Sequence, residues 1–352
     1  MGIIIAILVL SILIFFHELG HFTAARYFGV QVNVFSIGFG KKLYSRTIGT
    51  TQWSISAIPL GGYVQMKGQD DTDPTRISYD TDSYNAKKPW QRIVILLAGP
   101  FANFLLAFLL YVAIANIGVP KLLPSIGTVG ENTPALASGL QPNDKITQIN
   151  GNPIRFWDDI SPIIDAKDGD LFMTIERDNM LLSLQLTPKV IEDKNMFGET
   201  ITRRIIGITS SGVQETITFG PIESLQYAWD ETKRASFMIV QSIQKLITGV
   251  IGAENLSGVI TIVDVTSKAS AAGITALFFF TALISVNLGV LNLLPIPALD
   301  GGHIMFNLYE MFTGKTASEK SMIAITLFGW SILISLMLLG LYNDINRIWG
   351  AN

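Results

Sequence analysis

Four long stretches of the sequence contain no charged side chain, and they constrain the fold more than any other feature. They cover residues 1–16, 93–119, 269–299 and 321–343. A helix needs about 20 mostly apolar residues to cross the hydrocarbon layer of a membrane. Only 15% of the residues are charged, whereas soluble domains average about 25%. The sequence therefore predicts an α-helical membrane protein with four transmembrane helices.

The distribution of lysine and arginine predicts the orientation of these helices. Four spans place both termini and the segment 120–268 on one side of the membrane. The two remaining segments, 22–92 and 303–320, hold most of the positive charge near the spans. Because positively charged loops stay in the cytoplasm, the segment 120–268 is expected to be exported. The net charge of −3, without a basic run, argues against a nucleic-acid partner.

His17, Glu18 and His21 form the pattern H-E-x-x-H where the first apolar stretch ends. Two imidazoles one helical turn apart can ligate one metal ion, and the glutamate beside them can deprotonate a metal-bound water. The chain has three histidines and no cysteine, so a metal site must use His, Asp, Glu or water. The motif predicts a zinc enzyme with Glu18 as general base, placed at membrane depth where ionisable groups are functional by default.

Asp300 and His303 are the two candidates for a third protein ligand. Both follow the third apolar stretch, and the parity of the spans places them at the depth of the H-E-x-x-H motif. Pro295 and Pro297 interrupt the helix just before them, which is tolerated at membrane depth inside protein or beside a water-filled cavity. Either side chain can bind zinc. Asp300 could instead cap the following helix.

The chain resembles the site-2 proteases, which are zinc intramembrane proteases, and in particular the bacterial regulator-of-sigma-E protease type. The motifs that carry the resemblance are "HELGH", "VFSIGFGKKL", "IPLGGYVQMKG", "KKPWQRIVILLAGPFANFLLA" and "NLGVLNLLPIPALDGGH", in the family's order. The resemblance implies that His17, His21 and Asp300 hold Zn²⁺, that Glu18 is the general base, and that His303 is a neighbour. Gly99 and Asn103 are interpreted as packing residues that let helices approach closely.

The resemblance also implies a class of substrate. Asn292, Asn287 and Phe39 are expected to contact it, although amides such as these two often bridge helices instead. The expected substrates are single-pass membrane proteins, such as anti-sigma factors or remnant signal peptides, already trimmed by another protease. The expected location is the bacterial inner membrane, with the zinc site toward the cytoplasmic side.

Two other classes of function remain as alternatives. A catalytically idle membrane chaperone or PDZ scaffold would not need Glu18, so the intact motif counts against it. A metal transporter would need ligands through the full depth of the bilayer, whereas these candidates cluster in one leaflet.

Residues 30–68 predict a membrane-associated β-sheet. Four short segments alternate polar with apolar or β-branched residues and are separated by glycine-rich turns. A sheet edge beside the zinc could accept an unwound substrate segment as an added strand, with Phe39 near the tip. The outer pair of strands could equally be a structural hairpin. Residues 69–90 are expected to form a cytoplasmic loop.

The rest of the chain divides at changes of pattern. Residues 1–29 and 91–119 form the first two spans, 269–302 the third span with N-x-x-P-x-P-x-L-D-G-G, and 303–352 the fourth span with a tail. Residues 120–200 resemble one exported PDZ domain of the α+β class, with short strands, one short helix and a turn at Asn150–Gly151. Asn143 stands where such domains have a glycine and tolerates the same left-handed backbone. Residues 201–268 are expected to form a linker and an amphipathic helix, from Pro221 to Ile251.

Overall fold

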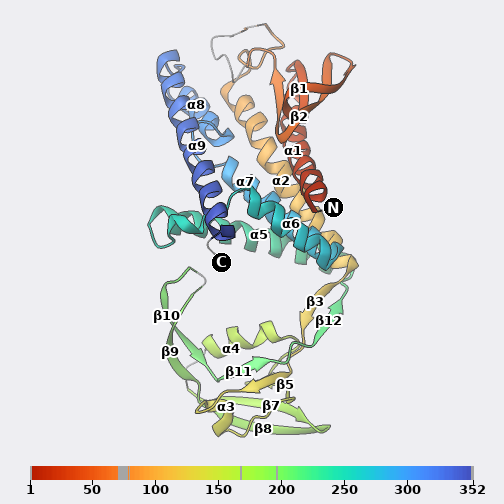
Figure 1. Cartoon of the computed structure of the whole chain (residues 1–352), viewed down its shortest axis with the longest axis vertical. Helices are drawn as coiled ribbons and strands as arrows, with labels where there is room; N and C mark the ends of the chain where they lie inside the picture. Colours follow the sequence, from red (N-terminus) through yellow and green to blue (C-terminus); the bar gives the residue numbers. More distant parts are fainter. Residues whose placement is uncertain (1, 70–77, 79, 167–168, 196, 350–352) are drawn as a thin grey trace. The chain divides into compact units, whose positions relative to one another are not determined.

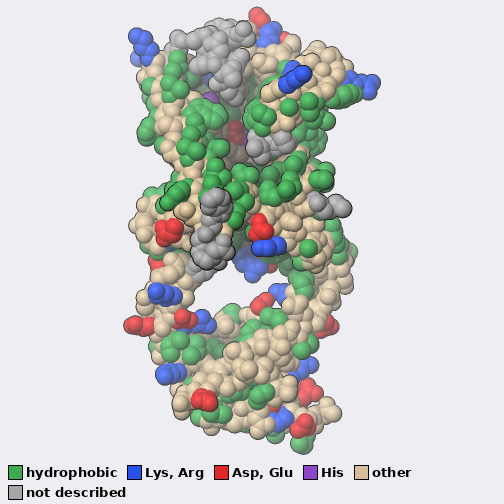
Figure 2. Space-filling model, viewed as in Figure 1, with side chains coloured by type: hydrophobic (Ala, Val, Ile, Leu, Met, Phe, Trp, Pro, Cys, Tyr) green, Lys and Arg blue, Asp and Glu red, His purple; other side chains and the backbone are tan. Residues whose placement is uncertain are grey.

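The computed structural model describes residues 2–69, 78, 80–166, 169–195 and 197–349. It divides into two compact units, drawn in Figure 1. The helical unit comprises Met1–Ile114 and Pro221–Asn352, and the inserted unit comprises Ala115–Gly220. On the face shown in Figure 2, hydrophobic side chains gather over the helical unit, and charged side chains are scattered over the inserted unit.

Four helices of the described chain are long and apolar enough to cross a membrane, which confirms that prediction. They are α1 (Gly2–Tyr27), α2 (Pro89–Ile117), α7 (Ile274–Asn292) and α9 (Glu319–Trp349). The third begins later than the apolar stretch does, because Gly273 has a φ of 118° and separates α7 from α6 (Val259–Ala272). Such a backbone favours glycine and ends the continuous helix. The apolar residues 269–272 therefore belong to α6.

Two further helices complete the helical unit. The amphipathic helix expected from Pro221 is α5 (Pro221–Ile247), which exposes Leu225, Trp229 and Val240 and packs against α7. The helix α8 (Asp300–Thr313) follows the proline-containing loop 293–299. A short 3-10 helix, Ala253–Asn255, connects α5 to α6.

The β-sheet predicted for residues 30–68 is present as two long antiparallel strands, β1 (Val32–Ile48) and β2 (Thr51–Met66). Each strand bends back, so that the first half of β1 pairs with both halves of β2. The segments therefore lie in the order 42–48, 51–56, 32–37 and 62–66. Segment 62–66 forms one edge, and no other strand among the described residues pairs with its outer side.

The inserted unit contains all remaining strands. These are β3 (Val119–Leu122), β4 (Ile126–Val129), β5 (Lys145–Ile149), β6 (Asn152–Pro153), β7 (Leu171–Arg177), β8 (Met180–Leu186), β9 (Lys189–Lys194), β10 (Thr200–Ile205), β11 (Ile208–Ser210) and β12 (Gln214–Ile217). The order β6-β5-β7-β8 forms a four-stranded sheet, and β9–β10, β4–β11 and β3–β12 form antiparallel pairs. The helices α3 (Pro134–Ala137) and α4 (Ile160–Ala166), with the 3-10 helix Trp157–Asp159, complete the unit.

Local expectations for this unit hold in the structure, but its predicted content and end differ. Asn143 and Asn150 have left-handed φ values of 73° and 52°, as their turns require. Two short α-helices are present in place of one. The unit extends to Gly220 instead of residue 200, because β11 and β12 return to pair with β4 and β3. The segment from 201 is therefore part of the inserted unit before α5 begins.

Candidate metal centre

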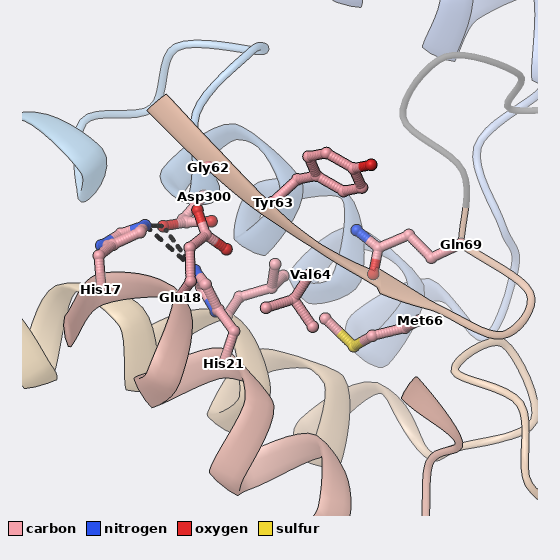
Figure 3. Close-up of a pocket in the computed structure, with 10 residues that line it drawn as sticks. His17, Glu18, His21, Gly62, Tyr63, Val64, Met66, Gln69 and Asp300 are labelled. Carbon is pink, nitrogen blue, oxygen red and sulfur yellow. Dashed lines mark hydrogen bonds and ion pairs between the residues drawn. The ribbon is translucent and has the colours of Figure 1, made fainter. Parts of the chain in front are cut away.

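Three potential metal ligands meet where α1 passes the start of α8. The helical spacing of four residues turns His17 and His21 to one face of α1, and their Nε2 atoms lie 3.2 Å apart. Oδ2 of Asp300 lies 3.4 Å from each of these nitrogens. Figure 3 shows the three side chains converging. His303, the other candidate for a third ligand, does not belong to this group.

The loop before α8 brings Asp300 to the histidines. A Cβ at Gly301 would lie 2.1 Å from the carbonyl oxygen of Leu294, and one at Gly302 would lie 2.4 Å from that of Ile296. The two glycines therefore let the first turn of α8 fold tightly onto the loop. At its other end, α8 is tied to α2 by an ion pair between Arg92 and Glu310, at 2.6 Å.

The three ligand atoms fit a zinc ion. Nitrogen and oxygen ligands about 2.0–2.1 Å from a tetrahedral zinc lie about 3.4 Å from one another, which matches the separations of 3.2 and 3.4 Å. Two imidazole nitrogens and one carboxylate oxygen are a donor set that zinc accepts with a fourth position open. Oδ2 of Asp300 is buried and receives no hydrogen bond from the part of the chain that the structure describes. A cation between the three atoms would satisfy it.

The helix α2 contacts the Nδ1 atoms of both imidazoles, on the side of each ring away from the other candidate ligands. Nδ1 of His21 lies 2.9 Å from the carbonyl oxygen of Ile95, which can only accept, so Nδ1 donates, and in a neutral ring Nε2 then carries the lone pair. Nδ2 of Asn103 lies 3.2 Å from Nδ1 of His17. A Cβ at Gly99 would lie 2.2 Å from Nε2 of His21. Gly99 thus lets α2 approach the His21 ring closely, as its interpretation as a packing residue expects, whereas Asn103 also has a polar contact with His17 that this interpretation did not include.

A cavity of about 120 Å³ lies in front of the three ligands and has room for several water molecules. Glu18 lines it, and the edge segment 62–66 supplies one wall through Gly62, Tyr63, Val64 and Met66. In Figure 3 this strand runs across the open side of the histidines. A Cβ at Gly62 would lie 3.2 Å from Cγ of Glu18, so the glycine lets the strand backbone approach the glutamate closely.

The residues expected to contact a substrate lie outside the cavity wall. Asn292 is the last residue of α7 and is half-buried, while Asn287 is exposed on the same helix. Phe39 is 44% exposed on β1, and its ring stacks on Tyr63 with centroids 6.1 Å apart. Phe39 therefore contacts the cavity wall through the ring of Tyr63. Tyr63 is not among the site residues predicted from the sequence. A Cβ at Gly61 would lie 2.1 Å from the ring of Phe39, so this glycine leaves space for the ring beside Tyr63.

Comparison with known proteins gives one family over nearly the whole chain. The description "Peptidase family M50" matches residues 5–336. A Campylobacter jejuni protein, provisionally named as a zinc metalloprotease, is 48% identical over 98% of this chain and 93% of its own length. A Helicobacter pylori protein with the same provisional name is 41% identical, over 98% and 99%. The regulator of sigma-W protease RasP of Bacillus subtilis is 30% identical, over 97% and 98%.

Proposed function

Because this chain belongs to peptidase family M50, we propose that it cleaves single-pass membrane proteins within or near their transmembrane segments. The chain is a multi-pass membrane protein and a zinc metalloprotease. The observation that carries the proposal is the position of the candidate metal centre. His17 lies about 22 Å along a helix of spanning length, which supports a cavity within the depth of a hydrocarbon layer about 30 Å thick.

The proposed roles follow from what each side chain can do. His17, His21 and Asp300 hold the zinc. When bound, zinc polarises the scissile carbonyl and lowers the pKa of a water molecule toward neutrality. Glu18 lines the same cavity, where its carboxylate accepts a proton from that water and later delivers it to the leaving amine. The Nδ1 hydrogen bond of His21 to Ile95 fixes the orientation of its ring.

The proposed binding mode uses the edge segment 62–66. A transmembrane helix hides its peptide groups in its own hydrogen bonds and must unwind before one can be attacked. The outer side of this segment pairs with no other strand among the described residues and lies beside Glu18, so an unwound substrate can add to it as a strand. Asn292 and Asn287, both on α7, would contact the same substrate segment. Phe39 would support the cavity wall by stacking on Tyr63.

We expect Glu18→Gln to retain zinc and to lose cleavage, because glutamine keeps the shape and lacks the basic carboxylate. The assay is cleavage of a tagged single-pass membrane protein by the full-length enzyme in liposomes, with zinc per chain measured on the same preparations. Activity above a few per cent of wild type would contradict the role of Glu18. Cleavage retained equally by wild type and variant would favour the alternative of an idle scaffold with a contaminating protease.

A second pair of variants tests the ligand set. Asp300→Ala should lower zinc per chain and abolish cleavage, because it empties one position of the group. His303→Ala is the matched control three residues further on, and it should keep zinc near wild type because its imidazole lies outside that group. The opposite result would assign the third ligand to His303.

For the inserted unit, we propose a PDZ-like exported domain that acts as a steric filter against substrates with folded ectodomains. Support comes from the charge asymmetry of the loops, which predicts that the segment 120–268 is exported. The deletion that tests this should respect the pairing of Val119 with Ile217, whose Cα atoms are about 5 Å apart in an antiparallel ladder. Removing only 124–189 would strip β11 of its partner β4.

The experiment replaces residues 120–216 by a short glycine-serine linker and compares cleavage of a full-length and a pre-trimmed version of one single-pass protein. The filter predicts that deletion accelerates cleavage of the full-length version and leaves the trimmed one unchanged. Slower cleavage of the trimmed version would instead indicate that the unit binds the new carboxyl terminus.

A further inference from the structure

Three positions of α2, spaced four residues apart, face the candidate metal ligands. Ile95 offers its carbonyl oxygen to His21, Gly99 leaves space for the ring of His21, and Asn103 contacts His17. A spacing of four residues keeps these positions on one face of a helix. Each imidazole thus has one partner on α2 for its Nδ1 atom: a backbone carbonyl for His21 and a side-chain amide for His17.

The amide of Asn103 has an incomplete set of hydrogen bonds. The residue is 0% exposed, and its Oδ1 atom is buried and has no hydrogen-bond donor among the described residues. Its main-chain oxygen accepts a hydrogen bond from Oγ of Ser285 at 2.8 Å, which anchors this turn of α2 to α7. A buried amide oxygen without a donor is unfavourable, and because the two ends of an amide are nearly equal in shape, either end can face His17.

Binding of a metal by His17 would supply the missing donor. A neutral imidazole carries one proton, and when Nε2 binds a metal the proton is on Nδ1. Nδ1 then donates and needs an acceptor. Nδ2 of Asn103, 3.2 Å away, is itself a donor and cannot serve, whereas Oδ1 can after the amide turns by about 180°, because the two ends of an amide are nearly equal in shape.

We propose that Asn103 is the positioning residue of His17, with its amide turned so that Oδ1 accepts the Nδ1 hydrogen bond when Nε2 of His17 holds zinc. The turn pairs the buried Oδ1 atom and gives His17 the arrangement that His21 already has with Ile95. This inference rests on the proposed function, since it takes His17 as a zinc ligand. Asn103 itself touches neither the metal nor the substrate.

The first test measures zinc affinity by competition with a chromophoric chelator, using the full-length protein in detergent. Asn103→Leu keeps the approximate size and removes the acceptor, and it should weaken zinc binding about tenfold to a hundredfold, as loss of such partners does. Asn103→Asp keeps an acceptor and should bind within about threefold of wild type or tighter. Ser285→Ala, which removes the neighbouring interhelical hydrogen bond, is the matched control and should also stay within about threefold.

The second test needs no substitution at Asn103. The chain contains three histidines, so ¹⁵N labelling of histidine gives a simple spectrum in which the protonated nitrogen of His17 can be assigned with a His303→Gln sample. Zinc-loaded wild type should show His17 with its proton on Nδ1. An unprotonated Nδ1, or equal zinc affinity of Asn103→Leu and wild type, would overturn the inference.

A third variant separates this inference from the proposed function. His17→Gln should lower zinc affinity more than Asn103→Leu does. If His17→Gln binds zinc as tightly as wild type, the ligand set itself is wrong. If His17→Gln weakens binding and Asn103→Leu does not, the ligand set stands and the role of Asn103 is wrong.

Discussion

The core of the inserted unit and the surroundings of the candidate metal centre are packed with different kinds of residue. The core of the inserted unit is made of large aliphatic side chains with almost no exposure, including Ile146, Ile149, Leu171 and Ile175. Around the candidate metal centre, contacts between helices run through small and polar residues instead. A Cβ at Gly20 of α1 would lie 2.1 Å from the carbonyl oxygen of Ala98 on α2, and Asn103 and Ser285 are fully buried.

This difference follows from the surroundings of each unit. In water, burial of aliphatic surface drives folding, whereas helices in lipid gain little from it and associate through close backbone approach and polar contacts. Added bulk should therefore have different consequences in the two places. In the inserted unit a substitution should change stability, and around α2 it should change the metal centre.

Gly99→Ala should have the largest effect. The added methyl group would lie 2.2 Å from Nε2 of His21, so the ring must leave its position. The expected loss in kcat/KM is roughly a thousandfold, about 4 kcal/mol, with zinc per chain reduced in parallel. Alanine otherwise favours a helix over glycine by about 1 kcal/mol, so thermal stability of the metal-free protein should not fall. Normal zinc content in this variant would contradict the claim that the close contact at Gly99 keeps His21 in position to bind the metal.

Asp144→Ala should have an intermediate effect that is confined to stability. Asp144 is 1% exposed and accepts two hydrogen bonds from Arg177, at 2.6 and 2.7 Å, and one from the backbone of Gln141. Since Arg177 is partly exposed, the expected loss is about 2 kcal/mol of unfolding free energy for the inserted unit. Limited proteolysis under increasing urea would measure it. Zinc per chain should be unchanged, and a loss of zinc would contradict the separation of the two units.

Gly151→Ala should have the smallest effect. Gly151 has a φ of 79° in the β5–β6 turn, and a Cβ there would meet no atom within 4 Å. The cost is therefore the left-handed backbone alone, about 1 kcal/mol. The same urea series should show a small shift of the midpoint for the inserted unit and no change in cleavage. A shift as large as that of Asp144→Ala would contradict the open space around this glycine, because the added methyl group would then have to collide with other atoms.

The features that could be predicted from the sequence are those set by residues close to one another in the chain. His17 and His21 are one helical turn apart, so their shared face follows from helical geometry, and the left-handed turns at Asn143 and Asn150 follow from the tolerance of asparagine. Asp300 came from the parity of the spans together with the family resemblance. The roles of His17, His21 and Asp300 in binding zinc stay predictions.

Features that depend on contacts between distant elements could not be predicted in this way. The role of Asn103 depends on which face of α2 meets α1, and many residues on a spanning helix are equivalent by composition. The end of the inserted unit depends on the pairing of β11 and β12 with strands about 80 or more residues earlier. The break at Gly273 lies inside an apolar stretch, where hydropathy does not distinguish one helix from two.

The pairing of Val119 with Ile217 at the base of the inserted unit has a consequence for the evolution of this architecture. Because both ends of the unit are fastened to each other, its interior can lengthen, duplicate or be exchanged while the chain leaves and re-enters at the same pair of residues. Selection can then alter what this part of the protein recognises without retuning the catalytic helices. A gene encoding such a protein has, at these two codons, a natural place to accept a different domain.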